Sequence, residues 1–200
     1  MKIAPDQEIP LFPLNTVLFP GGVLPLKVFE QRYIEMTKAC LRDNSPFGVC
    51  LIREGREVGA AAVPEAVGCL AVIESWDMPQ FGLFQLVARG GERFRIRDAR
   101  VAPNQLMSAV VEPLPPDAAA ERVDSLCRQV LQAVIEKVGA NQFPAPLRLD
   151  DASWVGYRLA EVLPLGARTK QELLEIANAG ERLERLRALL VEQGLKEREA

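Results

Sequence analysis

The residue types that most often carry chemistry are scarce in this sequence. It contains no histidine, which excludes imidazole as a general base, as the partner of a nucleophile and as a zinc ligand. Its four cysteines are spaced too widely for the C-x-x-C pair of a zinc or redox site. All four lie in apolar runs, so we expect small buried side chains rather than ligands or disulfides: Cys40, Cys50, Cys69 and Cys127.

Hydroxyls and carboxylates offer no clearer catalytic set. Ser75, Ser108 and Ser125 have no recognisable base beside them. The pair Asp150 and Asp151 precedes a helix-type segment, where carboxylates offset the helix dipole. No glycine is followed by Lys and then Ser or Thr, so the chain lacks the phosphate-binding loop of nucleotide hydrolases. We therefore predict no catalytic, cofactor-binding or metal-binding residue, and a protein that is not an enzyme.

The composition is that of a soluble globular protein. The 200 residues are 48% apolar and 26% charged, enough apolar surface to offset chain entropy by burial. The formal net charge is −3 and evenly spread, without the basic excess typical of nucleic-acid binding. No apolar run reaches the roughly 18 residues of a membrane span, and residues 1–8 lack the apolar core of a signal peptide. We expect a cytoplasmic protein with no membrane partner.

A proline-rich segment, residues 112–117, separates two parts of different pattern, and we predict domains over residues 1–115 and 116–200. Before it, Tyr33, Met36 and Cys40 recur at helical spacing and predict a helix over residues 29–42. Short apolar runs bounded by glycine, proline or charge predict strands that close or half-close a barrel. These strands cover residues 47–52, 67–73, 83–88, 93–97 and 106–112.

After this segment, helical periodicity prevails. Apolar residues follow an i, i+3, i+4, i+7 pattern over residues 123–138, and Gly139 follows as a C-cap. We predict further helices over residues 151–162 and 181–194. Between them, Thr169 and Glu172 form the pattern of a capping box that would open another helix. The second part therefore reads as a helical bundle.

The most specific segment is the run IPLFPLNTVLFPGGVLPL, residues 9–26. Prolines at positions 10, 13, 20 and 25 cannot donate to a sheet ladder, which predicts a turning stretch at a sheet edge and not a central strand. The other residues are mostly large and apolar. We expect this run to wrap and seal a core, although it could also present an open groove.

With the helix that follows it, this run resembles the opening of the substrate-recognition domain of Lon (La-type) ATP-dependent proteases, lPLFPL-x-x-V-LFPG-x-x-LPL. Five further segments resemble elements of that family in the same order. The resemblance covers roughly residues 8–192, and the five segments are residues 47–49, 67–73, 89–96, 169–175 and 181–186.

The resemblance implies an α+β fold, in which a PUA-like β-barrel with one inserted helix is followed by a C-terminal α-helical bundle. In full-length Lon proteases this module precedes an ATPase and a Ser-Lys protease module, and it helps to select damaged or tagged proteins. Because the chain stops at Ala200, we expect a stand-alone, non-catalytic recognition or adaptor module of protein quality control. The implied partners are unfolded or damaged polypeptides, with a separate protease or chaperone.

Residues 75–82 are the first candidate contact surface. Asp, Pro and Gly in this segment predict a hairpin loop between two strands. Trp76, Met78 and Phe81 would suit adaptable binding to apolar polypeptide if they are exposed. The competing interpretation is that they fold back over the barrel mouth and cap the core.

An arginine-rich strand is the second candidate. Arg93, Arg95 and Arg97 would share one strand face, with Arg100 nearby. Such a face could bind phosphate or an acidic protein, and PUA-like barrels elsewhere bind RNA. The alternative function is therefore an RNA-binding barrel. Flanking carboxylates favour a plain solvated face instead.

Overall fold

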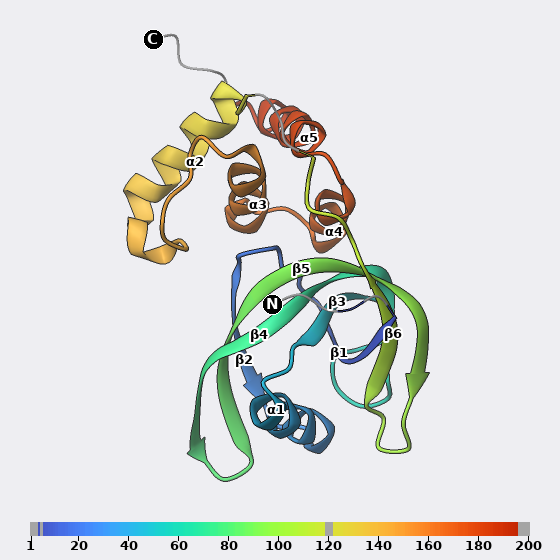
Figure 1. The fold of residues 1–200 in the computed structure, drawn as a ribbon. Coiled ribbons are helices and arrows are strands. Elements are labelled where there is room, and N and C mark those ends of the chain that lie inside the picture. The colour runs from blue at the N-terminus through green and yellow to red at the C-terminus, as the bar shows by residue number, and fades with distance from the viewer. Residues whose placement is uncertain (1–3, 5, 119–121, 196–200) are drawn as a thin grey trace. The chain divides into compact units, whose positions relative to one another are not determined.

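The computed structural model describes residues 4, 6–118 and 122–195, and over them it forms six strands, five α-helices and one 3-10 turn (Figure 1). The chain divides into two compact units, Met1–Pro115 (unit 1) and Pro116–Ala200 (unit 2). Unit 1 contains β1 (Gln7–Leu14), β2 (Val23–Val28), α1 (Gln31–Asp43), β3 (Phe47–Glu54), β4 (Val63–Gln80), β5 (Leu83–Val101) and β6 (Met107–Pro113). Unit 2 contains α2 (Ser125–Val138), η1 (Ala140–Gln142), α3 (Ala152–Val162), α4 (Ala167–Glu175) and α5 (Ala179–Glu192).

The strands of unit 1 form one mixed sheet. Their order is β2-β5-β4-β3-β1-β6, and β5 also pairs with β6, so five strands form a ring while β2 lies beside β5. β1 and β3 are parallel, and the other pairs are antiparallel. The α+β fold is therefore confirmed as a six-stranded mixed sheet with five helices in the described ranges, rather than as the clean barrel that the sequence predicts.

β4 and β5 are longer than the sequence predicts. The expected strands over residues 83–88 and 93–97 are one strand, β5, which passes through Gly90 without ending. Cys69 of β4 pairs with Arg93 of β5, and Ala71 of β4 pairs with Gly90 of β5. Between these two pairs, β4 has one intervening residue and β5 has two, so β5 carries one extra residue. Such a bulge bends a strand and increases its twist without terminating it. Figure 1 shows the two strands as a long curved hairpin.

The prediction that residues 9–26 avoid a central strand is wrong for β1, which lies between β3 and β6. Pro10 lies in the register with β6 but outside that with β3. Pro13 lies in the register with β3 but outside that with β6. Each proline therefore faces one neighbouring strand with which it does not pair. On that side no backbone N–H is needed for a ladder hydrogen bond, so the missing N–H of proline is tolerated. Pro25, in contrast, lies in the edge strand β2 as predicted.

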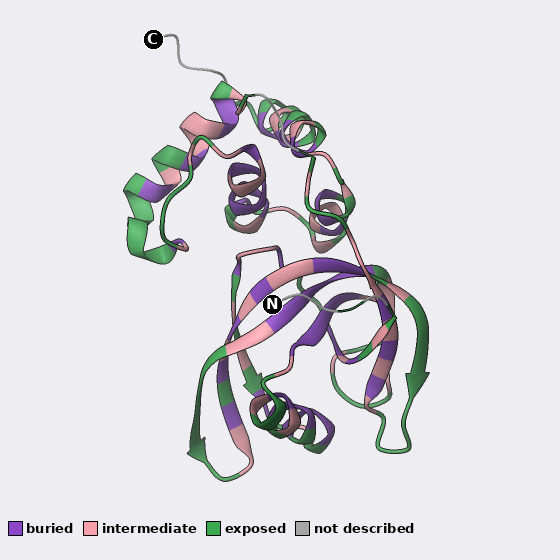
Figure 2. Cartoon of the chain, in the orientation of Figure 1, coloured by how far each residue is buried: buried purple, intermediate pink, exposed green. Residues whose placement is uncertain are grey.

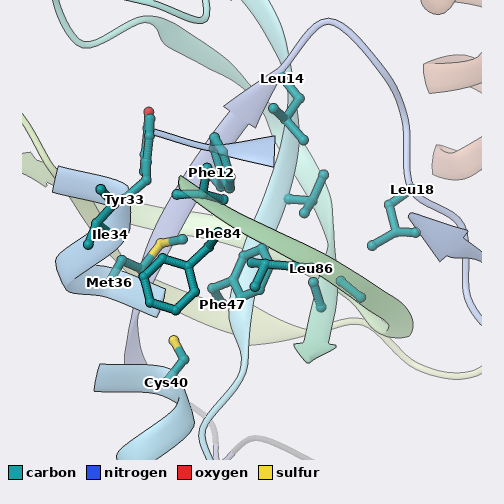
Figure 3. Packing of buried hydrophobic residues seen from close by; sticks show 14 of the residues in the cluster. Phe12, Leu14, Leu18, Tyr33, Ile34, Met36, Cys40, Phe47, Phe84 and Leu86 are labelled. Carbon is teal, nitrogen blue, oxygen red and sulfur yellow. The ribbon is translucent and has the colours of Figure 1, made fainter. Parts of the chain in front are cut away.

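Two hydrophobic clusters stabilise unit 1. In the first, the predicted face of α1, with Tyr33, Met36 and Cys40, packs against aromatic side chains of the strands (Figure 3). The rings of Tyr33 and Phe12 stack with centroids 4.1 Å apart. The second cluster gathers around Phe94 of β5. Figure 2 shows the buried positions along the strands of unit 1.

The cysteines behave as the sequence predicts. All four are buried free thiols, and each contributes apolar volume to the interior of its unit. Burial raises the pKa of Cys40 and Cys50 above the ordinary thiol value, which keeps them protonated and unreactive.

The helices of unit 2 follow the predicted pattern with one correction. Asp124 caps α2 by accepting a hydrogen bond from the Cys127 amide at 2.9 Å, and Gly139 ends that helix. Asp151 caps α3 in the same way. The predicted capping box at Thr169 is wrong, since α4 begins two residues earlier, behind Gly166. The two residues before Thr169 are good helix formers, which extends α4 upstream.

A buried ion pair links the start of unit 2 to α5. Arg182 forms a salt bridge with Asp117, and Tyr157 donates a hydrogen bond to the same carboxylate at 2.8 Å. The side chains of Asp117 and Arg182 are 4% and 0% exposed. Burial by itself raises the pKa of Asp117, but hydrogen bonds from Arg182 and Ser153 outweigh it and leave the pKa below its ordinary value. The carboxylate therefore stays charged.

Within the described ranges, no helix combines the length and the apolar character that crossing a membrane requires.

Candidate functional site

Residues 75–82 are the end of the β4–β5 hairpin and not the loop that the sequence predicts. Pairing continues to Gln80 and Leu83, so the turn consists of Phe81 and Gly82. Gly82 has a φ of +82°, a left-handed conformation that glycine adopts without strain. In the described part of the chain this end of β4 pairs with β5 alone. A proline at position 79 is therefore compatible with the strand.

The three apolar side chains proposed as a contact surface are open to solvent. Trp76 is 53% exposed, Met78 is 44% exposed and Phe81 is 99% exposed. Figure 2 shows the end of the hairpin as exposed. Trp76 is anchored on one side, because its ring lies 5.6 Å from that of the buried Phe84. We call Trp76, Met78 and Phe81 the hairpin patch.

A shallow groove of about 550 Å³ adjoins the hairpin patch. It is lined by residues 25–27 of β2, 75–77 of β4 and 85–87 of β5. These residues meet because β5 pairs with β2 on one side and with β4 on the other, which places Leu26, Leu86 and Trp76 in one cross-strand row. Neighbours in such a row lie on the same face of a sheet. Trp76 is thus part of an apolar row and not an isolated exposed residue.

The structure does not bring the three arginines onto one solvated face. Arg93 is 4% exposed and donates a hydrogen bond to the Pro115 carbonyl at 3.3 Å. Arg95 and Arg97 are exposed, and Arg97 forms a salt bridge with Glu112. Arg93 and Arg95 keep the predicted alternation, since both pair with β4 in unbroken register. Arg93 is nevertheless buried because the segment that follows β6 packs against it, where the Leu114 amide donates to the Arg93 carbonyl at 2.9 Å.

Arg100, the arginine that the sequence predicts near this face, is also paired. Arg100 donates a hydrogen bond from Nε to Glu8 at 2.9 Å, and Ser108 donates to the same carboxylate at 2.6 Å. Hydrogen bonds from Ser108 and Arg100 hold the pKa of Glu8 below its ordinary value. Carboxylates therefore neutralise much of the arginine-rich strand, and nothing in this arrangement favours RNA over solvent.

A second hollow, which we call the seam pocket, lies between β1 and β2 and has a volume of about 220 Å³. Pairing of β1 with β6 stops at Leu11, and the next residues of β1 line the pocket. Much of the run is buried in the core, as expected for a sealing segment, including Leu11, Phe12 and Phe19, and the seam pocket is a small hollow beside it. The lining comprises Phe12, Leu14 and Thr16, residues 24–28 of β2, Phe29, Glu30 and Tyr33, and Glu57 and Val58.

Buried Arg32 pairs with Glu30, one of the residues that line the seam pocket. Its guanidinium donates to the carbonyls of Gln105 at 3.0 Å and Glu57 at 3.3 Å, and it pairs with Glu30 at 3.0 Å. It thereby ties two loops to the start of α1. The charged residues in the lining are Lys27, Glu30 and Glu57, and the rest of the lining is mostly apolar. No motif in the sequence marks this arrangement, because its members are up to 73 residues apart.

Metal-binding geometry is not seen in the described residues. No three acidic or cysteine side chains among them gather so as to hold a metal ion. Residues 6–113 of unit 1 present exposed apolar surface beside two hollows, the groove at the hairpin patch and the seam pocket.

Comparison with known proteins agrees with this surface chemistry. The family model described as "ATP-dependent protease La (LON) substrate-binding domain" matches residues 8–192. The chain belongs to the Lon substrate-binding domain family. The match extends from β1 through α5 and so includes the hairpin patch, both hollows and the buried ion pair of unit 2.

Solved structures share this fold. A crystal structure titled Lon N-terminal domain protein, from Xanthomonas campestris, is 37% identical with a TM-score of 0.76, and the alignment covers 91% of this chain and 98% of that one. The N-terminal domain of a Mycobacterium avium complex Lon protease has a TM-score of 0.66 over 92% of this chain and 97% of that one. At 19% identity, the second shows the fold alone.

Curated Lon proteases are similar in sequence. Lon protease 2 of Herpetosiphon aurantiacus is 29% identical over 96% of this chain, and Lon protease of Koribacter versatilis is 32% identical over 95% of it. The chain spans about a quarter of the length of these relatives, 25% and 24% respectively.

Proposed function

We propose that this chain is a non-catalytic module that binds unfolded or damaged polypeptides through the hairpin patch. The observation that carries the proposal is the exposure of Trp76, Met78 and Phe81 at the end of the β4–β5 hairpin, beside an apolar cross-strand row. Large exposed apolar side chains on a soluble domain mark an interaction surface, and Trp and Met are common at such surfaces. Membership of a substrate-binding family supports the same function.

An unfolded polypeptide is the best-suited partner because the patch is apolar and the neighbouring charges are balanced. Lys27 and Asp77 stand on either side of Gln85 in one cross-strand row of the groove, so the groove favours neither sign of charge. A nucleic acid would require a basic surface. Such a patch binds weakly and adapts to many sequences, as a module that samples exposed hydrophobic segments requires.

Three finer features belong to this proposal. The protein works without attached ATPase or protease modules, as a cytoplasmic adaptor to a separate protease or chaperone. The strand ring of unit 1 is a variant of the PUA-like barrel, which the β5–β6 pairing supports. The helices of unit 2 form a bundle, since α3 contacts α2, α4 and α5.

The test is binding of a Trp-free unfolded chain, reduced and carbamidomethylated ribonuclease A, followed by fluorescence anisotropy of a dye on that chain. The hairpin variant carries Trp76→Ser, Met78→Ser and Phe81→Ser. We expect it to bind more than about tenfold more weakly than the unmodified protein, because about three apolar contacts are lost.

A matched control replaces two exposed valines of unit 1 that lie outside the hairpin patch, Val63→Ser and Val101→Ser, which are 41% and 48% exposed. The control should bind like the unmodified protein. Absence of binding by the unmodified protein, or equal loss in the hairpin variant and the control, would show that the patch is not the binding surface.

A further inference from the structure

The free edge of β2 offers a second mode of contact with the same class of partner. We propose that an extended apolar segment of the bound polypeptide adds to β2 as a further strand and places an apolar side chain in the seam pocket. This inference rests on the proposed function and specifies how the polypeptide is held. It differs from the hairpin patch in using backbone hydrogen bonds.

β2 is an edge strand with its outer side open. It ends the strand order and pairs with β5 alone among the strands of the described chain. Apart from the bonds to β5, no backbone hydrogen bond joins Val23–Val28 to another described segment. Val23 is 47% exposed, and the Pro25 and Lys27 side chains are also exposed. An edge of this kind presents unpaired N–H and C=O groups to an incoming strand.

The register shows which groups of β2 are free. The Gly90 amide donates to the Gly22 carbonyl at 2.8 Å, and Gly22 stands opposite Gly90 when the pairing of Val23 with Arg89 is extended by one residue. In antiparallel pairing, residues alternate between bonding across the ladder and turning outward. Leu24 and Leu26 therefore bond to β5, whereas the backbone groups of Val23, Pro25 and Lys27 face outward.

The position of Pro25 agrees with this assignment. A proline without an N–H is tolerated on an edge strand when it faces away from the ladder. The outer edge then offers two N–H donors, from Val23 and Lys27, and three carbonyl acceptors. Pro25 and Lys27 also guard the edge against uncontrolled aggregation, which leaves room for weak, reversible addition of one strand.

The seam pocket indicates what the added strand carries. Leu24, Leu26 and Val28 line it from the β2 side, so every second residue of an added strand would face the same hollow. Its 220 Å³ exceeds a cavity of about 150 Å³ that holds benzene, and so accommodates a Phe or Leu side chain. Because most of the lining side chains are apolar, the occupant is a segment with alternating apolar residues and not a charged ligand.

The first experiment measures amide exchange by NMR in the full chain, with and without a ten-residue peptide in which Phe, Leu and Val alternate with Thr. Added peptide should slow exchange of the Val23 and Lys27 amides by about tenfold or more. The amides of Leu24 and Leu26 are already bonded to β5 and serve as internal controls. Unchanged exchange at Val23 and Lys27 under saturating peptide would overturn the proposal. Protection that depends on protein concentration without peptide would overturn it as well, in favour of a second copy at the edge.

The second experiment modifies the peptide and leaves the protein untouched. Two analogues carry backbone N-methyl groups, either on every Thr or on every apolar residue. Because an added strand directs alternate N–H groups to β2, one analogue should lose about tenfold or more in affinity and the other should not. Equal affinities of the two analogues would contradict strand addition.

A protein variant tests the pocket. Val58→Glu places a charge at the rim of the seam pocket on a side chain that is already exposed, and Val101→Glu is the matched control on β5. Peptide affinity should fall about tenfold in the first and stay unchanged in the second. If unfolded polypeptide binds and the hairpin variant weakens it while Val23 and Lys27 do not respond, strand addition fails and the proposed function stands. If no polypeptide binds, both fail.

Discussion

Replacing Asp117 by Asn removes a charge and leaves the shape of the side chain almost unchanged. In the folded protein this carboxylate accepts hydrogen bonds from Tyr157 and from both terminal nitrogens of Arg182. Arg182 is fully buried. Asp117→Asn therefore leaves a buried guanidinium without its counter-charge, and we expect unit 2 to lose most of its stability.

The expected size follows from the burial of the pair. Removing one partner of a buried ion pair costs about 3–5 kcal/mol, and an amide that keeps some hydrogen bonds belongs at the low end. For a unit the size of residues 116–200, each kcal/mol lowers the melting temperature by roughly 4–8 °C. Asp117→Asn should thus lower the unfolding temperature of unit 2 by about 12 °C or more.

The chain supplies its own reporter and its own control. It contains two tryptophans, Trp76 in unit 1 and Trp154 in unit 2, so a Trp76→Phe background makes the fluorescence of Trp154 specific to unit 2. The matched control is Asp150→Asn, whose ion pair with Arg128 is solvent-exposed on both sides. An exposed pair contributes less than about 1 kcal/mol. If Asp117→Asn and Asp150→Asn shift the melting temperature equally, the buried pair is not what holds unit 2 together.

The same pair predicts a pH dependence with a definite sign. The folded-state pKa of Asp117 lies below its ordinary value of 3.8, so the unfolded chain binds this proton more readily. The stabilisation is present above pH 3.8 and is lost as the pH falls through the lower folded-state pKa. The stability advantage over Asp117→Asn should therefore shrink below pH 3.8, as seen in urea titrations at several pH values. A constant difference across that range would contradict this account.

Three further predictions concern unit 1. Gly90→Ala should destabilise unit 1 by about 1–3 kcal/mol or more, because a Cβ at this position would lie 2.1 Å from the Phe19 carbonyl oxygen. Urea unfolding followed by Trp76 fluorescence measures the change in stability, and a neutral effect would refute the close approach. Cys50 should resist a thiol reagent such as Ellman's until the protein unfolds, since it is buried with a raised pKa; rapid labelling in native buffer would contradict its burial. Arg32→Lys should lower the free energy of unfolding by about 2 kcal/mol, because a lysine cannot reproduce hydrogen bonds to two carbonyls and an ion pair. An unchanged urea unfolding curve would show that these bonds contribute little.

For the candidate surfaces, the sequence left open whether Trp76, Met78 and Phe81 are exposed or cap the core, and strand alternation placed Arg93 on a solvated face. Trp76, Met78 and Phe81 are exposed, but they end a strand hairpin instead of forming a loop. Arg93 was expected beside Arg95 on a wet face and is buried. Arg93 is buried against the segment around Pro115, which lies 22 residues further along the chain, and strand alternation carries no information on such a contact.

Local patterns account for much of the fold. The helical period over residues 123–138 and the glycine that follows are enough to place α2, and the apolar face of α1 is equally clear. Turn residues and apolar runs also locate most strands. These features depend on neighbours within a few positions, which the order of amino acids contains directly.

Tertiary structure decided the rest. It placed β1 between two strands despite its prolines, joined Asp117 to Arg182 across 65 residues, and left the edge of β2 open beside the seam pocket. Such features depend on which distant segments pair and pack, and that choice is made by the total burial and hydrogen bonding of the chain rather than by any local run. Residue types along the chain determined what kind of surface it could offer, and strand pairing determined where that surface lies.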